Sequence, residues 1–231
     1  MEKKRTQIAA AIDAAVLAPE LSVAEARAQA QIAIDYRCKT VCVRPCSLAD
    51  AVRLCEGTKT RASVVLGFPH GCQTTATKVE EARDTMRHKP VEVDMVGNIG
   101  MLRSGDFSSY EEEVCAVAGV VHAGGAGLKV ILETTKLTRN EIIEATRACI
   151  RAGADFVKTS TGFAGGGATV EAVAAMLEAA EGKIEVKASG GIRDRETALM
   201  YLDMGVTRLG VGVSSVPAIV AGGEGVGDSP Y

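Results

Sequence analysis

The sequence predicts a single (β/α)8 barrel, in which eight parallel strands are enclosed by helices. Eight short runs rich in apolar and β-branched residues recur along the 231 residues, and helical patterns lie between them. No linker or change in composition divides the chain. Because 47% of the residues are hydrophobic and only 3% are aromatic, small aliphatic side chains must pack the core, which favours helices on a sheet over a β-sandwich.

The eight runs have the length and the flanking residues of buried parallel strands. They are short, and Gly, Pro or polar residues bound them, as expected for strands covered on both faces. They span residues 8–13, 40–43, 62–68, 91–96, 128–133, 155–160, 184–189 and 207–213.

Several of the intervening helical segments carry a start signal. In the capping box S/T-x-x-E, a hydroxyl and a carboxylate satisfy the first backbone amides of a helix. Such a start is possible in residues 22–25, 77–80, 108–112 and 138–141, and residues 168–181 have apolar residues at helical spacing. An open doubly wound sheet is the alternative, although no GxGxxG follows the first run to support dinucleotide binding.

We expect the barrel to occupy residues 1–221 as one domain. The remaining residues, 222–231, are rich in Gly, and we expect them to form a flexible C-terminal tail.

Charge and composition exclude several functional classes. The 26 Lys and Arg against 29 Asp and Glu give a net charge of −3, which provides no basic footprint for nucleic acid. No uncharged apolar stretch is long enough to span a membrane, and Asp13 interrupts the apolar N-terminal stretch that a signal peptide would need. We therefore expect no nucleic-acid or membrane partner.

The odd number of cysteines, seven, indicates a reducing cytoplasmic location.

Three of these cysteines raise the question of a metal site. Cys38, Cys42 and Cys46 lie four residues apart, a spacing that would align them on a helix. Because residues 40–43 are largely β-branched and Pro45 follows, we expect a strand and a loop, on which the three thiols would not converge. We therefore expect no metal site and interpret these cysteines as small buried apolar side chains.

Ionisable residues stand within four of the predicted strands. The active site of this architecture lies at the carboxyl ends of the strands. Asp94, Lys158 and Lys187 occupy such positions, and Lys129 sits nearer the middle of its strand. Because residues 155–160 and 184–189 are successive strands of a parallel sheet, Lys158 and Lys187 are expected to be neighbours.

A buried lysine pair of this kind can support carbonyl chemistry. Burial and a nearby second cation both lower the pKa of a lysine, and the resulting neutral amine attacks a carbonyl carbon to form a Schiff base. Asp94 could balance the charge and relay protons, and Lys129 is expected to be a further charge partner. The alternative is a purely structural network of Lys and Asp ion pairs inside the barrel, and the pattern alone leaves both possibilities open.

Glycines and hydroxyls follow the last three predicted strands. They lie in residues 159–169, 189–193 and 210–215. Backbone amides in such loops at helix N-termini bind phosphate, and the last strands of these barrels are a frequent phosphate site. Glycines can also serve only to form tight turns. Their clustering on three successive strands favours a phosphorylated substrate.

Five segments resemble those of the deoxyribose-phosphate aldolases and occur in that family's order. They are VCVRP (41–45), EVDMVGNIG (92–100), LKVILET (128–134), FVKTSTGFAGGGATVE (156–171) and VKASGGIRD (186–194). Together they cover nearly the whole chain. The last two are the more specific.

The resemblance implies a (β/α)8 class I aldolase that uses neither metal nor cofactor. The implied reaction is 2-deoxy-D-ribose 5-phosphate ⇌ D-glyceraldehyde 3-phosphate + acetaldehyde. By matching position, Lys158 is the Schiff-base lysine, Lys187 tunes it, and Asp94 is an acid/base residue that works through water. Several family members end in a tyrosine that assists proton transfer, and this chain ends in Tyr231. The substrate-binding candidates are Asp13, Cys42, Lys129, Thr161, Gly162, Gly190, Gly191, Gly210, Gly212, Ser214 and Ser215.

Two segments depart from the family's pattern. In the first strand, IDHTLL is replaced by IDAAVL, so Ala14 and Ala15 stand where the family has His and Thr. A hydroxyl near the substrate is therefore missing. In the last strand, alignment on the glycine places the family's serine pair at Gly212 and Val213, whereas alignment on the serines uses Ser214 and Ser215.

These departures keep two other functions open. The protein could be a Schiff-base aldolase for a different sugar phosphate or aldehyde, or a barrel that binds a sugar phosphate without turnover. An intact lysine pair disfavours the second, because binding alone needs no free amine. The family further implies a homodimer or homotetramer.

Overall fold

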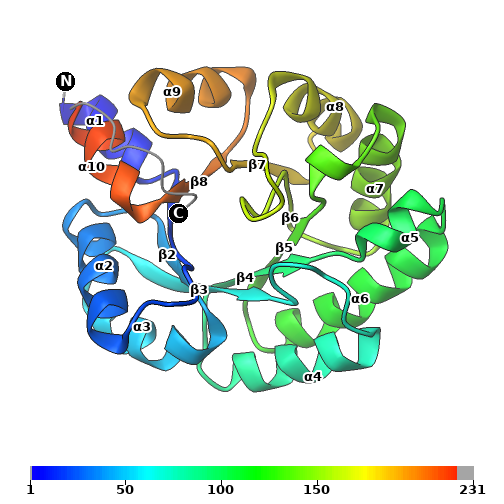
Figure 1. Ribbon diagram of the computed structural model, residues 1–231, viewed down its shortest axis with the longest axis horizontal. Coiled ribbons are helices and arrows are strands. Elements are labelled where there is room, and N and C mark those ends of the chain that lie inside the picture. Colours follow the sequence, from blue (N-terminus) through cyan, green and yellow to red (C-terminus); the bar gives the residue numbers. More distant parts are fainter. Residues whose placement is uncertain (1, 223–231) are drawn as a thin grey trace.

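The computed structural model describes residues 2–222 and confirms the (β/α)8 barrel. Eight parallel strands form a closed barrel in sequence order, and β1 pairs with β8 to complete the ring (Figure 1). This closure excludes the open doubly wound sheet. The strands are β1 (Ile12–Val16), β2 (Thr40–Val43), β3 (Arg61–Leu66), β4 (Glu92–Val96), β5 (Gly127–Ile131), β6 (Phe156–Lys158), β7 (Glu185–Ser189) and β8 (Arg208–Gly212).

Helices form the outer layer of the barrel (Figure 1). The described α-helices are α1 (Glu2–Ala9), α2 (Val23–Asp35), α3 (Leu48–Cys55), α4 (Thr75–Met86), α5 (Ile99–Arg103), α6 (Phe107–Ala123), α7 (Arg139–Arg151), α8 (Val170–Ala180), α9 (Arg195–Met204) and α10 (Val216–Ala221). Short 3-10 turns, η1 (Pro45–Ser47), η2 (Thr134–Lys136) and η3 (Val213–Ser215), follow β2, β5 and β8.

The first strand begins later than the composition of residues 8–13 suggests. Ile8 and Ala9 belong to α1, and β1 begins at Ile12. The prediction was wrong because a short apolar run is compatible with a strand or with a buried helix turn. α1 lies beside α10, where Ile8 is buried and Arg5 donates a hydrogen bond to the carbonyl of Ala221 (2.8 Å) (Figure 1).

Two of the four predicted helix starts are confirmed. Ser22 and Thr138 each form a complete capping box with the glutamate three residues later. The other two predictions were wrong, since α4 is capped by Thr74 and α6 by Asp106. In both cases the capping side chain lies nearer the N-terminus than the proposed box, because an oxygen at that earlier position already accepts the amide at N3.

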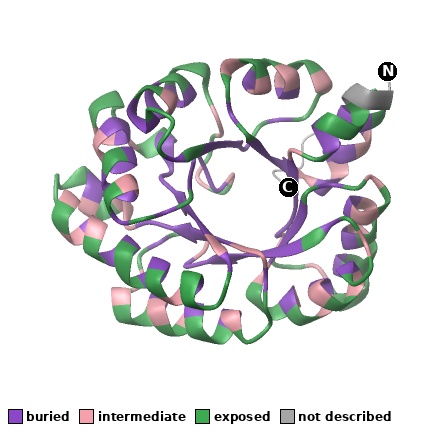
Figure 2. Ribbon diagram, turned by 180° about the vertical axis from the view of Figure 1, so that it is seen from behind, coloured by how far each residue is buried: buried purple, intermediate pink, exposed green. Residues whose placement is uncertain are grey.

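Both faces of the strands are buried (Figure 2). Outward-facing residues of the strands pack against the helices in one large core of Ala, Val, Ile and Leu. A second, smaller cluster consists of Ala15, Leu17, Cys42 and Val65, with Phe68 packed against it, and we call it the mouth cluster. These residues lie in or just after β1, β2 and β3, at the carboxyl ends of the strands. No helix in residues 2–222 is long and apolar enough to cross a membrane.

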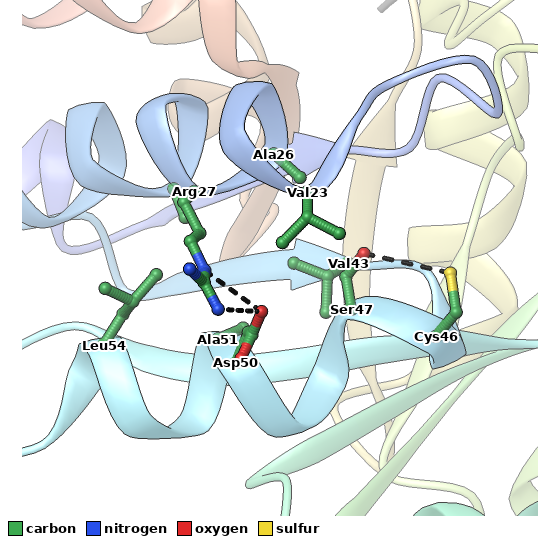
Figure 3. A pocket seen from close by; sticks show the side chains of 10 residues that line it. Val23, Ala26, Arg27, Val43, Cys46, Ser47, Asp50, Ala51 and Leu54 are labelled. Carbon is green, nitrogen blue, oxygen red and sulfur yellow. Dashed lines mark hydrogen bonds and ion pairs between the residues drawn. The ribbon is translucent and has the colours of Figure 1, made fainter.

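The three closely spaced cysteines separate in the fold. Cys38 and Cys42 are buried, as predicted, but Cys46 is exposed. Cys46 lies in η1, at the edge of a shallow groove between α2 and α3, where its thiol is 3.9 Å from the Ser47 hydroxyl (Figure 3). The interpretation as buried side chains was wrong for Cys46, because the chain leaves the sheet at Pro45. Within the described part of the chain, no three His, Cys, Asp or Glu residues are arranged to hold a metal ion.

Candidate active site

The pairing of β6 with β7 places the two predicted lysines side by side. Lys158 and Lys187 are directly opposite each other in the register, so their side chains share the inner face of the barrel. Both are buried, at 3% and 1% exposure. Both ammonium groups donate to the same carboxylate oxygen, Oδ2 of Asp94, at 3.0 Å from Lys158 and 2.7 Å from Lys187. The expected proximity of Lys158 and Lys187 is therefore confirmed.

Asp94 is surrounded by cations. Its second oxygen, Oδ1, accepts a hydrogen bond from Lys129 at 2.9 Å. Burial by itself would raise the pKa of Asp94, but the ammonium groups of Lys129, Lys187 and Lys158 hold that pKa well below 3.8. Asp94 is therefore a carboxylate at neutral pH, as the charge-balancing role requires.

A second ring of charges lies toward the amino ends of the strands. Asp13 accepts hydrogen bonds from Lys187 (2.6 Å), Arg208 (2.8 Å) and Thr40 (2.7 Å). Burial by itself would raise the pKa of Asp13, but Lys129, Lys187 and Arg208 lower it below its usual value. Glu92 in turn binds Lys129 at 2.5 Å and Arg208 at 2.7 and 3.0 Å.

The candidate residues differ in their hydrogen-bond partners. Asp13 and Lys129 are nearly fully buried and bind Glu92 or Arg208, the first residues of β4 and β8. They belong to a buried charge network, which Lys187 also joins through Asp13, and such a network was the alternative considered for the lysines. Lys158 differs from both because it ends β6, and its ammonium group has one hydrogen-bond partner among the described residues, Asp94. Its remaining N–H donors are available to a ligand.

The glycine loops after β6 and β7 pack directly on each other. Gly162, Gly190 and Gly191 have positive φ angles of 86°, 86° and 77°. The amide of Ala168 donates to the carbonyl of Gly190 at 3.1 Å, and a Cβ at Gly167 would overlap that carbonyl. The loop after β6 lies over the opening of the barrel (Figure 1). Glycine is required here for close approach of two backbones as well as for turning.

The end of β8 distinguishes the two alignments of the last strand. Val213 is 2% exposed and packs in the main core, so its side chain does not line a polar site. Ser214 is half-buried and Ser215 is buried, both in η3 directly before α10. Gly210 and Gly212 lie in β8 beside β1.

Cys42 is buried in the mouth cluster, where burial raises the pKa of its thiol. Tyr231 and the rest of the tail beyond Gly222 lie outside the described residues.

Three residues of this region were not predicted from the sequence. Glu92 and Arg208 complete the second ring of charges, and Glu133, just after β5, binds Thr161. Glu92 and Arg208 stand at the amino ends of their strands, where polar residues are ordinary, so position alone gave no signal. Glu133 lies just after the carboxyl end of β5, where active sites of this fold lie, and that position could have identified it.

Comparison with known proteins relates this chain to aldolases. The model of the DeoC/LacD family aldolases matches residues 6–220. A deoxyribose-phosphate aldolase of Exiguobacterium sibiricum is 43% identical over 97% of this chain and 99% of its own. The deoxyribose-phosphate aldolase of Aeropyrum pernix, described as a tetramer of unique structure, superposes with a TM-score of 0.86 at 28% identity, over 94% of this chain and 91% of its own.

A further solved structure, QR15, an aldolase, superposes with a TM-score of 0.87 at 38% identity, covering 93% of this chain and 95% of its own. A closed barrel with ionisable side chains gathered at its mouth defines the class as a (β/α)8 enzyme. The chain belongs to the DeoC/LacD family of aldolases. The resemblance to deoxyribose-phosphate aldolases noted in the sequence is thereby confirmed.

Proposed function

We propose that this protein is a Schiff-base lyase that cleaves 2-deoxy-D-ribose 5-phosphate reversibly to D-glyceraldehyde 3-phosphate and acetaldehyde. The observation that carries the proposal is the shared contact of Lys158 and Lys187 with Oδ2 of Asp94 inside the barrel mouth. Named relatives at 40–43% identity over most of the chain favour this substrate over another sugar phosphate or a non-catalytic role.

The reaction begins with Lys158. Its ammonium group passes a proton to Oδ2 of Asp94, and the neutral amine adds to the C1 aldehyde carbon of the substrate. Loss of water gives a protonated imine, which withdraws electrons from the adjacent carbons. The proton moves along the 3.0 Å hydrogen bond to Asp94, and the positive charge of Lys187 on the same oxygen favours its release from there to water.

Bond cleavage then uses the imine as the electron acceptor. A base removes the proton of the C3 hydroxyl, the C2–C3 bond breaks, and its electron pair forms the enamine. D-Glyceraldehyde 3-phosphate leaves, C2 takes up a proton, and water hydrolyses the imine to free acetaldehyde and Lys158. The cations that keep Asp94 ionised make it a short-lived proton carrier, which suits a relay through a water molecule.

The packed glycine loops are proposed to receive the phosphate. Gly162 is half-buried and Gly191 is exposed, each four residues after a lysine of the pair, and Ser214 lies half-buried after β8. Backbone amides and hydroxyls of this kind are suited to phosphate oxygens. Binding at a distance from C1 orients the aldehyde toward the lysine.

The departure in β1 affects the site at one position. Ala14 faces the main core, whereas Ala15 lies in the mouth cluster with Cys42. Ala15 therefore replaces a hydroxyl by a methyl group on the wall of the mouth. This supports a proposed tolerance for more apolar aldehydes, which assays of acetaldehyde beside propanal as the donor would measure.

Three further proposals rest on family likeness. Tyr231 assists proton transfer, the chain forms a homo-oligomer, and the protein works in the cytoplasm. The tetrameric relative supports the homo-oligomer, and the seven free thiols are suited to the cytoplasm. Light scattering of the purified protein, together with the activity of Tyr231→Phe, tests the first two.

Trapping of the imine tests the proposed function. Incubation with 2-deoxy-D-ribose 5-phosphate and borohydride should reduce the imine to a stable adduct, and peptide mapping should place it on Lys158. Lys158→Leu should abolish turnover with little effect on folding, because leucine fills much of the same space. Lys187→Leu is the matched control, in which activity falls while Lys158 is retained. An adduct on another lysine, or none, would refute the mechanism.

A further inference from the structure

Glu133 is a buried acidic residue to which the proposed reaction gives no role. It follows β5, is 1% exposed, and has φ 57° and ψ 59°, in the left-handed region. This conformation costs free energy for any residue with a Cβ atom, and it persists where the surrounding structure imposes it, often at functional sites. A glycine would avoid the cost, so the carboxyl group of Glu133 must serve a purpose that offsets it.

The main chain around Glu133 is fixed to the strand that carries Lys158. The amide of Leu132 donates to the carbonyl of Lys158, and the amide of Thr134 donates to the carbonyl of Thr159, each at 2.9 Å. Glu133 lies between these two hydrogen bonds. Its left-handed conformation directs the chain from the end of β5 into η2.

The carboxyl group of Glu133 binds the turn that follows β6. The hydroxyl of Thr161 donates to Oε2 at 2.5 Å, and the amide of Thr161 lies within 3.4 Å of both carboxyl oxygens. The same hydroxyl accepts a hydrogen bond from the amide of Phe163 at 3.0 Å. Gly162, with φ 86°, is thereby enclosed in a turn of which Glu133 is the anchor.

The anchored turn presents an aromatic ring to the opposite side of the mouth. The ring of Phe163 stacks edge-on against Phe68, with centroids 5.2 Å apart and an interplanar angle of 85°. Phe68 packs on the mouth cluster, which comes from β1, β2 and β3. One series of contacts therefore joins β5, the loop after β6 and the far wall of the mouth.

We propose that Glu133 is a positioning residue, which fixes the turn from Thr161 to Phe163 so that Phe163 closes against Phe68 over the apolar side of the site. This inference rests on the proposed function. The turn begins three residues after Lys158, contains Gly162, and opens the loop that packs on Gly190. Loss of the anchor should therefore impair use of the phosphorylated substrate more than imine formation itself.

Glu133→Gly provides a sharp test, because it removes the anchor and also the conformational cost. We expect the melting temperature to stay the same or rise, while kcat/KM for 2-deoxy-D-ribose 5-phosphate falls at least about tenfold. Borohydride trapping of acetaldehyde alone on Lys158 should persist. Glu133→Gln keeps the size and one acceptor oxygen, and it should restore much of the lost activity.

Arg37→Gly is the matched control. Arg37 has the same φ of 57°, is exposed, and lies before β2 at the amino end of the barrel. Its replacement should raise stability similarly and leave kcat/KM unchanged. Hydrogen exchange of residues 161–167 should become faster in Glu133→Gly, much less so in Glu133→Gln, and stay unchanged in Arg37→Gly.

The outcomes separate the two proposals. Unchanged kcat/KM in Glu133→Gly, or unchanged exchange of the loop, would overturn the role of Glu133. A loss of stability parallel to the loss of activity would show a merely structural residue and would also overturn it. Failure of the unsubstituted protein to form any adduct would refute the proposed function, and the exchange measurement would then still decide whether Glu133 anchors the turn.

Discussion

Asp94 is the side chain on which the charges at the barrel mouth converge. Three lysines donate to its two oxygens, so removing the carboxylate would leave several cations buried without their partner. Buried ion pairs of this kind contribute little net stability when complete, but breaking one is costly. The arrangement therefore holds Lys158 and Lys187 together more than it stabilises the fold.

The low pKa of Asp94 predicts how stability depends on pH. A carboxyl whose pKa is lower in the folded state than in the unfolded state stabilises the fold above about pH 4, and that contribution is lost as the pH falls further. At pH 7, Asp94→Asn should lower the free energy of unfolding by roughly 3–5 kcal/mol. The difference from the unsubstituted protein should shrink between about pH 5 and pH 2 in urea titrations. A difference independent of pH would contradict the assigned cause.

At the scale of elements, helix ends show where local sequence is ambiguous. Thr74 and Thr77 are both hydroxyl residues near the start of α4, and their hydroxyls are 2.9 Å apart. Only Thr74 has extended backbone and accepts the amide of Thr77. A pattern of residue types cannot distinguish them, because the choice depends on where the chain leaves the loop after β3.

The two threonines give a paired prediction. Thr74→Ala should lower the free energy of unfolding by about 1 kcal/mol, because it leaves the amide of Thr77 without its acceptor. Thr77→Ala removes a hydroxyl but keeps that amide bound, so its effect should stay within about 0.5 kcal/mol. Urea unfolding of both variants measures the difference. Equal losses would show that the helix begins at neither residue alone.

At the scale of the whole molecule, the site depends on closure of the barrel. Asp13 of β1 binds Lys187 of β7 and Arg208 of β8, so the strands on both sides of the closing seam supply the charge ring. Gly210 permits this approach, since it pairs with Asp13 on one side and Ser189 on the other. The loops at the mouth can converge only because the sheet returns to its first strand.

Gly210→Ala tests this closure. An added Cβ would lie 2.8 Å from Cβ of Ser189 and 3.2 Å from Cε of Lys187. We expect a loss of about 1–3 kcal/mol in the free energy of unfolding and reduced turnover, because Lys187 must shift. Gly119→Ala, at an exposed position of α6, is the control. Nothing lies within 4 Å of a Cβ added there, and the free energy of unfolding should rise by up to about 1 kcal/mol. A stable and fully active Gly210→Ala would contradict the crowding.

The sequence by itself determined the (β/α)8 fold and the residues at the centre of the site. Strand and helix periodicity is local, and Asp94, Lys158 and Lys187 stand out because charges are rare inside apolar strands. The sequence alone could not determine the start of β1, the caps of α4 and α6, or the roles of Glu92, Arg208 and Glu133. Those depend on which strands become neighbours. Only closure of the barrel made Asp13 and Lys129 partners in a buried charge ring, because contacts between residues far apart in the chain have no local pattern.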